Sequence, residues 1–182
     1  MQLKFLKLKE EHLEQVRLWR MKPEVSQFMY TSPDIFPEEQ KQWYRKTSED
    51  PYNKYWIIES NKKKVGLVSL NDIDLINRKT TWAYYIGKLS ERGKGIGKQV
   101  ELNILCYAFD KMNLNKVWGE VFAFNKKVIK LHEKCGSKIE GFLKEHICKN
   151  GKFYDVVTMG ILKSDWKKIK GQFQIEEALI ED

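Results

Sequence analysis

The sequence predicts one mixed α/β domain with a largely antiparallel sheet. Its 182 residues give a single domain of ordinary size, long enough to bury a substantial core. Hydrophobic residues make up 42% and aromatic residues 13%, which excludes an intrinsically disordered chain. Segments with strand and helix periodicity alternate along the chain, in an order that gives about six to seven strands and about four helices.

The first third of the chain predicts a strand and two helices. Alternating apolar and charged residues over 3–8 are typical of a strand. Apolar residues at helical spacing over 10–21 predict a helix that ends before Pro23. An aromatic stretch broken by Pro33 follows, as a loop or short helical turn. A proline and two acidic residues then match a first helical turn, so we expect the second helix over 37–48.

The middle of the chain predicts three strands and a long helix. β-Branched and aromatic residues indicate a strand beginning at 55–58 and further strands over 65–71 and 80–87. A glycine-rich turn at 92–97 follows. Apolar residues recurring every four positions then predict a helix from 96 to 112 with one wide apolar face.

The last part of the chain predicts a strand over 117–123 and a short helix from Asn125 to about Gly136. Two more strands are expected over 138–148 and 153–162. The Asn-Gly pair between them is a strong signal for a two-residue hairpin turn.

Charge and cysteine content narrow the partners and the compartment. The formal net charge of +8 is typical of proteins with an anionic partner, such as nucleic acid, a membrane surface or a phosphorylated small molecule. Cys106, Cys135 and Cys148 have no CxxC spacing, so we expect no disulfide framework, no metal site and a reducing, cytoplasmic location. We place the domain at residues 1–170 and a polar, loosely ordered tail at 171–182.

The most informative segment is Arg-Gly-Lys-Gly-Ile-Gly at residues 92–97, between a predicted strand and a predicted helix. Glycines allow a sharp turn and a close approach of a ligand to the backbone, and amides at a helix N-terminus bind anions. The spacing fits neither a Walker loop nor the dinucleotide fingerprint GxGxxG. The alternative is a turn that only caps the helix.

Two motifs resemble those of the GCN5-related N-acetyltransferase (GNAT) superfamily. Residues 92–97 resemble its pyrophosphate-binding motif, (Gln/Arg)-x-x-Gly-x-(Gly/Ala), at the usual position between a strand and a helix. Asn125 and the Leu-His-Glu-Lys-Cys-Gly run at 131–136 resemble a second signature, in which Ser137 replaces the usual phenylalanine. The resemblance implies a GNAT fold, with helices on both faces of the sheet and two central parallel strands that splay apart.

The resemblance extends to two branches of the superfamily. Residues 19–20, 23–25 and 28–30 resemble the N-terminal signature of the nucleotide-amino-sugar acetyltransferases of pseudaminic acid biosynthesis. This implies acetyl transfer from acetyl-CoA to the 4-amino group of UDP-4-amino-4,6-dideoxy-N-acetyl-β-L-altrosamine, by direct attack of the amine on the thioester. Residues 140–155 are similar to the ribosomal-protein-acetylating branch, so acetylation of a protein N-terminus is the alternative.

The superfamily resemblance also implies which residues hold acetyl-CoA. Amides of the glycine turn would bind the pyrophosphate, an asparagine would bind the pantetheine arm, and a backbone amide at the end of strand 80–87 would polarise the thioester carbonyl. The expected residues are Ile86, Gly87, Arg92, Gly93, Lys94, Gly95, Ile96, Gly97, Lys98 and Asn125.

Two side chains are candidates for proton transfer. His132 occupies the position where many GNAT enzymes carry a tyrosine that protonates the leaving thiolate; it would donate a proton, only hydrogen-bond the sulfur, or merely cap its helix. Glu120 lies between Trp118 and Phe122 on one strand face, so we expect a partly desolvated carboxylate that acts as the base. The alternatives for Glu120 are an ordinary ion pair or a relay through water or Tyr84.

Met29, Tyr30, Tyr84 and His146 are the candidate residues for binding the acceptor. We expect a small-molecule, nucleotide-linked amino sugar as substrate and a possible homodimer. Neither nucleic acid nor a membrane is an expected partner, because the sequence has no zinc spacing, aromatic RNA-binding signature or one-faced basic helix. A coenzyme A-binding protein without catalysis is the remaining alternative.

Overall fold

The structure, a computed structural model, describes residues 1–31 and 34–182, so Pro33 of the predicted loop lies outside the described residues. The strands are β1 (Leu3–Lys7), β2 (Lys54–Ser60), β3 (Lys63–Asp74), β4 (Lys79–Ile86), β5 (Lys116–Phe122), β6 (Lys138–Lys149), β7 (Lys152–Leu162) and β8 (Leu179–Ile180). The α-helices are α1 (Leu13–Met21), α2 (Pro23–Ser26), α3 (Pro37–Ser48), α4 (Ile96–Cys106), α5 (Lys126–Lys134) and α6 (Lys163–Ile169).

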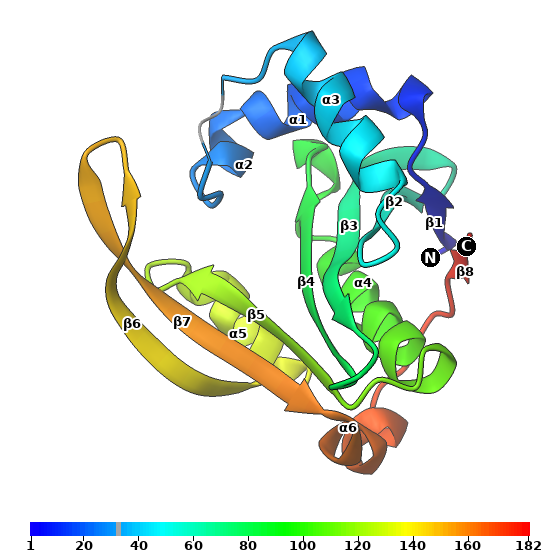
Figure 1. Ribbon diagram of the computed structural model, residues 1–182. Helices are drawn as coiled ribbons and strands as arrows, with labels where there is room; N and C mark the ends of the chain where they lie inside the picture. Colours follow the sequence, from blue (N-terminus) through cyan, green and yellow to red (C-terminus); the bar gives the residue numbers. More distant parts are fainter. Residues whose placement is uncertain (32–33) are drawn as a thin grey trace.

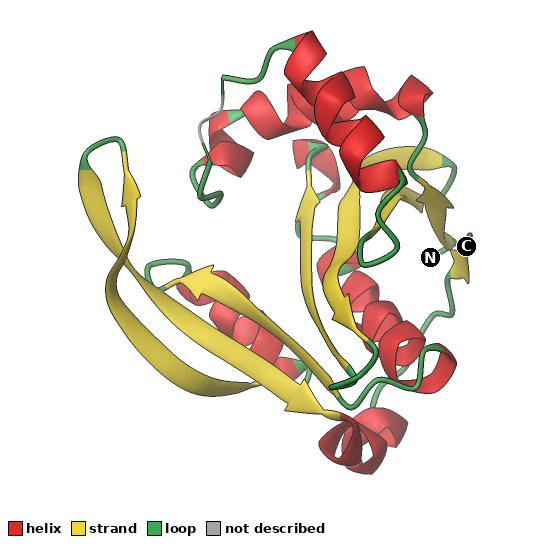
Figure 2. Ribbon diagram, viewed as in Figure 1, coloured by secondary structure: helices red, strands yellow, loops and turns green. Residues whose placement is uncertain are grey.

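All described strands form one mixed sheet in the order β6-β7-β5-β4-β3-β2-β1-β8. Helices α1, α2 and α3 lie on one side of this sheet, and α4 and α5 lie on the other (Figure 1; Figure 2). No helix in the described parts of the chain combines the length and apolar character needed to cross a membrane.

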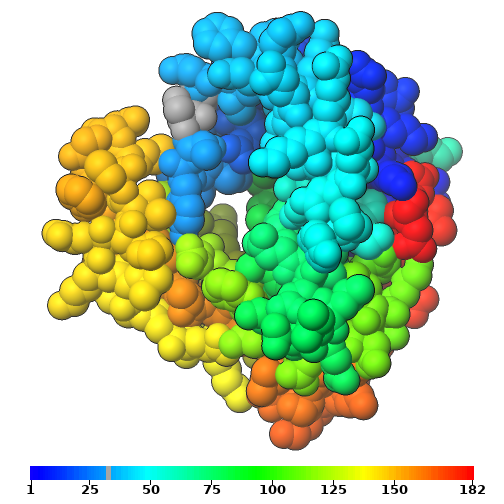
Figure 3. All heavy atoms as spheres, viewed as in Figure 1, coloured from blue at the N-terminus to red at the C-terminus, as the bar shows by residue number. Residues whose placement is uncertain are grey.

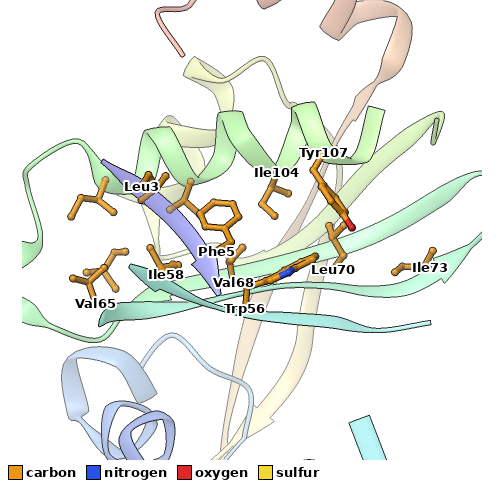
Figure 4. Packing of buried hydrophobic residues seen from close by; sticks show 13 residues of the cluster. Leu3, Phe5, Trp56, Ile58, Val65, Val68, Leu70, Ile73, Ile104 and Tyr107 are labelled. Carbon is orange, nitrogen blue, oxygen red and sulfur yellow. The ribbon is translucent and has the colours of Figure 1, made fainter. Parts of the chain in front are cut away.

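The two faces of the sheet have separate cores, because successive residues of a strand point to opposite sides. On one face α4 packs against alternate residues of the first strands, as Figure 4 shows. The residues on that face with almost no exposed area include Phe5, Trp56, Ile58, Val68 and Leu70. On the other face Val16 and Trp19 of α1 pack against Ile57, Leu67 and Tyr85. The sequence alternation thus fixes which helix covers which face.

Strands β4 and β5, near the middle of the sheet, are paired over only part of their length. They pair in parallel only from Lys79–Lys116 to Thr81–Trp118. Beyond that point β4 stays paired with β3 and β5 stays paired with β7, so the two halves of the sheet diverge (Figure 1). This confirms the splayed parallel strands. The space-filling view shows a hollow between the segment that carries α2 and these two strands (Figure 3).

The structure confirms the fold class and corrects its details. The described residues form eight strands rather than six to seven, and six α-helices rather than about four, because α2 and α6 are short and β8 lies in the tail. The prediction of a loosely ordered tail is wrong: β8 pairs in parallel with β1, and Glu181 N donates to Phe5 O at 2.9 Å. The prediction relied on the polar composition of the tail, which does not show that backbone groups of the tail pair with β1 at the edge of the sheet.

Candidate active site

The glycine turn forms an open cradle of backbone amides at the N-terminus of α4. Gly93 and Gly95 have φ values of 79° and 81°, a left-handed conformation that costs other residues roughly 1 kcal/mol or more. The first helical hydrogen bond runs from Gln99 N to Gly95 O, and no described residue accepts a hydrogen bond from the backbone amides of 93–98. Nothing lies within 4 Å of a Cβ added at Gly93 or Gly95, so a ligand can approach. The cradle therefore suits a phosphate group.

The side chains around this turn differ in what they do. Arg92 holds neighbouring segments together: its Nε donates to Ile86 O at 2.9 Å, and both Nη atoms donate to Glu24 O at 3.2 Å. Lys94 is ion-paired with Glu91 at 2.9 Å, and the Lys98 ammonium lies 5.6 Å from the centre of the Phe173 ring. Arg92 thus joins the turn to β4 and α2, a role that the motif alone did not suggest.

The end of β4 offers one free amide toward the gap, not two. Gly87 N donates to Val65 O on β3 at 2.9 Å, which contradicts its expected role as a free donor. Because N–H groups alternate along an antiparallel strand, the amide of Ile86 faces the edge that β5 has left. Asn125 immediately precedes α5, and its side chain does not cap that helix. Ile86 and Asn125 therefore remain predictions for the thioester and the pantetheine arm.

His132 lies at the point where β4 and β5 separate. It is only 8% exposed, and its ring centre lies 5.0 Å from that of Trp82 on β4. Its Nδ1 lies 3.0 Å from Oε2 of Glu101, a carboxylate on α4 with no exposed area. Sequence reasoning missed Glu101. The available signal was an acidic residue one turn before Leu105, in the apolar stripe of α4.

A small cavity lies beside the imidazole. Its volume is about 20 Å³, which is room for one water molecule, and its lining is Trp82, Gly119, Glu120, Val121, His132, Ser137 and Met159. The two predicted catalytic residues therefore border the same space, although they come from α5 and β5.

Tyr84 lies with this group and not with the acceptor residues. It stacks on Trp82 at 5.4 Å and packs on the α4 face, whereas Tyr85 packs on the α1 face. Burial first, and then Glu101, raises the pKa of the Tyr84 phenol well above its usual value. The same two causes raise the pKa of the Cys135 thiol. Both groups are therefore neutral at physiological pH. The expectation that Tyr84 binds the acceptor is corrected, because Tyr84 packs on the α4 face.

Glu120 projects from the face of β5 that is turned away from α4 and α5, where it is exposed rather than desolvated. The hydroxyl of Tyr30 donates to its Oε2 at 3.1 Å. Burial first, and then Glu120, raises the pKa of Tyr30, so this phenol stays protonated. The structure thus brings together a predicted base and a predicted acceptor residue, but the expected desolvation of Glu120 is wrong, because its side chain is exposed.

Aromatic rings and cations surround this pair. Ring centres lie 4.9 Å apart for Tyr30–Phe122, 6.0 Å for Phe28–Phe124 and 5.5 Å for Phe122–Tyr154. Lys149, near the tip of the β6–β7 hairpin, donates from Nζ to the carbonyls of Ser26 and Met29, each at 2.6 Å. The hairpin is thereby tied to the segment after α2.

The two remaining candidates for acceptor binding, Met29 and His146, lie in different places. Met29 contributes its carbonyl oxygen to the Lys149 contact, as described, and its side chain packs at the edge of the α1 core. His146 is exposed on β6, within a register shift of the β6–β7 pair between Leu143 and Ile147. The structure does not bring His146 into contact with Tyr30 or Glu120.

The splayed parallel strands and the open amide turn at the start of a helix are those expected of an acyl-CoA-dependent transferase, and the chain belongs to the GNAT family of acetyltransferases. The model of the acetyltransferase (GNAT) domain matches residues 2–138. The protein is an acetyl-CoA-dependent N-acetyltransferase.

Two relatives and one solved structure show what the chain is similar to. Spermidine N(1)-acetyltransferase of Vibrio cholerae is 30% identical over 143 residues, 78% of this chain and 82% of that protein. The acetyltransferase PseH of Campylobacter jejuni is 28% identical over 129 residues, 71% of this chain and 78% of that protein. The crystal structure of the Vibrio cholerae spermidine N-acetyltransferase with CoA and spermine has a TM-score of 0.86 at 28% identity, and the match covers 91% of this chain and 98% of that one.

Proposed function

We propose that the protein transfers acetyl to the 4-amino group of a UDP-linked amino-deoxy sugar, of the kind used in the pseudaminic acid pathway. The observation that carries this proposal is the chemistry of the acceptor side of the gap. It combines flat aromatic rings with an excess of cations, which suits a substrate that has a sugar, a base and a diphosphate.

The cations come from the segment that leads into the acceptor loop and from the hairpin that meets it. Arg20 donates to Thr31 Oγ1 at 2.6 Å, and Lys22 donates to Gly87 O at 3.2 Å. Burial, and then the charge of Arg20, lowers the pKa of Lys149, as expected for two cations in one region. Repulsion between them favours an anionic ligand and disfavours a polycation.

The chain's own residues supply the steps of a direct transfer. Acetyl-CoA supplies an activated acyl thioester. Glu120, hydrogen-bonded by Tyr30, takes the proton from the attacking ammonium group, directly or through water. The Ile86 amide stabilises the negative charge that develops on the carbonyl oxygen. His132 supplies a proton at the sulfur.

A second candidate is acetylation of a polyamine. It is favoured by the similarity to spermidine N(1)-acetyltransferase of Vibrio cholerae and by the exposed Glu120 beside aromatic rings, which is a possible cation site. Acetylation of a protein N-terminus is a third, drawn from the C-terminal sequence alone.

The test is release of CoA thiol with three acceptors: a UDP-4-amino-4,6-dideoxy sugar, spermidine and an N-terminal peptide. We expect kcat/KM for the nucleotide sugar to exceed the other two by at least about tenfold, since cations on the site are worth more than 1 kcal/mol. Added salt should raise the KM for the nucleotide sugar. Faster turnover of spermidine, or of the peptide, would contradict the proposal.

A variant of Arg20 tests whether this residue binds the nucleotide sugar. Arg20→Ala should raise the KM for the nucleotide sugar about tenfold or more while the KM for acetyl-CoA stays constant. Lys46→Ala, which removes an exposed cation of α3, is the matched control. An equal rise in this KM in both variants would show that it depends on the net charge of the protein and not on Arg20 itself.

A homodimer is part of the same proposal. Strand β6 is at one edge of the sheet, and Ile139 and Phe142 on it are about half exposed, at 53% and 51%. Light scattering over a concentration series should show a species of twice the chain mass. A monomer at every concentration would contradict this part.

A further inference from the structure

The buried carboxylate of Glu101 is the least expected group in the molecule. It lies on α4 with no exposed area, among the apolar residues Leu102, Ile104 and Leu105. Its Oε2 contacts His132 Nδ1 at 3.0 Å, and its Oε1 is buried without a hydrogen-bond partner in the described structure. Such a carboxylate is costly to bury unless a positive charge or a shared proton compensates it.

The neighbours leave the imidazole as the group that compensates Glu101. The titratable groups that face the pair are Tyr84 from β4, Cys135 from α5 and Lys98 from α4, with Glu120 from β5 across the cavity. Tyr84 is neutral, the Cys135 thiol hydrogen-bonds Glu101 but carries no charge, and Lys98 is exposed, with its ammonium over Phe173. A proton shared between Oε2 and Nδ1, which lie 3.0 Å apart, is therefore what can compensate the buried carboxylate.

The shared proton has a consequence for the other ring nitrogen. The buried pair is neutral in two arrangements: an ionised carboxylate beside an imidazolium, or a protonated carboxyl that donates to Nδ1 of a neutral imidazole. In both arrangements Nε2 carries a hydrogen, whereas a neutral imidazole with its only hydrogen on Nδ1 would leave Glu101 a buried anion without a compensating charge. Nδ1 faces α4, so Nε2 is on the side of the ring turned away from Glu101, and the ring borders the small cavity at the closed end of the gap.

We propose that Glu101 is a positioning residue for the acetyl transfer, and that it acts by keeping Nε2 of His132 protonated and aimed at the position of the thioester sulfur. This inference rests on the proposed role of His132. In the transfer, the acceptor nitrogen forms a bond to the acetyl carbon and the carbon–sulfur bond breaks. His132 gives its Nε2 proton to the sulfur, and solvent reprotonates Nε2 before the next turnover. The acceptor ammonium loses two protons, the first to Glu120 before it attacks and the second to water as the carbon–sulfur bond breaks, and Glu120 then releases its proton to solvent.

The first test examines the free protein, so it does not depend on any acceptor. The imidazole ¹⁵N resonances of His132 are followed against pH in the wild type, in Glu101→Gln and in Glu133→Gln. Glu133 is the matched control, because it is next to His132 in sequence but exposed. We expect the titration midpoint of His132 in Glu101→Gln to move to lower pH by about one unit or more, and to stay unchanged in Glu133→Gln.

The second test uses turnover as a double-mutant cycle. Glu101→Gln should lower kcat about 10- to 100-fold with little change in the KM for acetyl-CoA, and the alkaline limb of kcat should move to lower pH. In the His132→Tyr background a phenol needs no carboxylate, so Glu101→Gln should change kcat less than about threefold.

The outcomes separate the inference from the proposed function. Equal losses in both backgrounds, or an unmoved His132 titration in a folded Glu101→Gln protein, would overturn the role of Glu101. If Glu101→Gln does not fold, Glu101→Asp replaces it, because the shorter acid should weaken the Nδ1 contact and give the same shift in smaller measure. A wrong acceptor assignment would leave the NMR result standing.

Discussion

At the residue scale, function divides between the two faces of β5. His132, with Glu101 behind it, approaches the gap from the side of α4 and α5. Glu120, with Tyr30 against it, approaches from the side of α2. In the proposed mechanism the acid His132 and the base Glu120 therefore reach the gap between β4 and β5 from opposite faces of β5.

His132→Ala should lower kcat about 100-fold while the KM for acetyl-CoA changes less than about threefold, because proton donation matters only as the sulfur leaves. Steady-state kinetics with acetyl-CoA varied at saturating acceptor measures both constants. An unchanged kcat would remove His132 from the mechanism and reduce it to a helix-capping residue.

Tyr85→Phe tests a buried hydroxyl outside the site. Tyr85 is 9% exposed, and its hydroxyl has no hydrogen-bond partner in the described structure. Removing it should therefore leave the free energy of unfolding unchanged or raise it by about 1 kcal/mol at neutral pH, as read from urea denaturation. A loss of more than about 1 kcal/mol would show that an ordered water satisfies this hydroxyl.

The same residue carries a pH dependence. Burial raises the pKa of Tyr85 above its ordinary value of 10.0, so its contribution to stability is complete below pH 10.0 and is lost as pH rises toward the folded value. Wild-type stability should therefore fall above that pH, and the fall should be shallower in Tyr85→Phe. Parallel curves for the two proteins would assign the alkaline loss to other groups.

At the element scale, the turn before α4 depends on backbone conformation and α5 depends on contact with α4. The left-handed glycines at 93 and 95 shape a turn whose amides have no acceptor among the described residues, and Arg92 fixes the turn to β4 and α2. The turn can thus be damaged without touching any group that contacts the acyl chain.

Gly95→Ala should raise the KM for acetyl-CoA several-fold with kcat nearly unchanged, because a φ of 81° strains any residue with a Cβ by about 1 kcal/mol or more. Calorimetric titration with CoA measures the binding step alone. Gly171→Ala, at a glycine with open space and no positive φ, is the control. Equal CoA affinity in the two variants would place the diphosphate elsewhere.

At the scale of the whole molecule, the tail secures the sheet edge farthest from the β6–β7 hairpin. The indole of Trp56 donates to Glu181 O at 2.6 Å, and the Asn103 side chain bonds both Glu176 O and Ala178 N. The tail therefore closes the core between α4 and the first strands, and it connects β8 to the helix that begins at the glycine turn.

Deletion of residues 174–182 should lower the free energy of unfolding by roughly 3 kcal/mol or more, from several hydrogen bonds at about 1 kcal/mol each and the exposed edge of β1. Urea denaturation of the truncated chain checks this value. Deletion of Asp182 alone, which leaves β8 in place, should cost much less. Equal stability of the truncated and full chains would show that the tail contributes no stability, as predicted for a loosely ordered segment.

The sequence by itself determined the fold class, the order of the main strands and helices, and the glycine turn proposed to bind phosphate, because each depends on local signals: periodicity, glycine spacing and helix-capping patterns. It also placed His132 and Glu120 as candidates. Only the tertiary structure decided that Glu101 meets His132, that Glu120 is exposed beside Tyr30, that Tyr84 belongs to the α4 face, and that the tail adds a strand. Each of these depends on which distant segments share a surface, and a carboxylate has the same sequence signature whether it faces solvent or another helix.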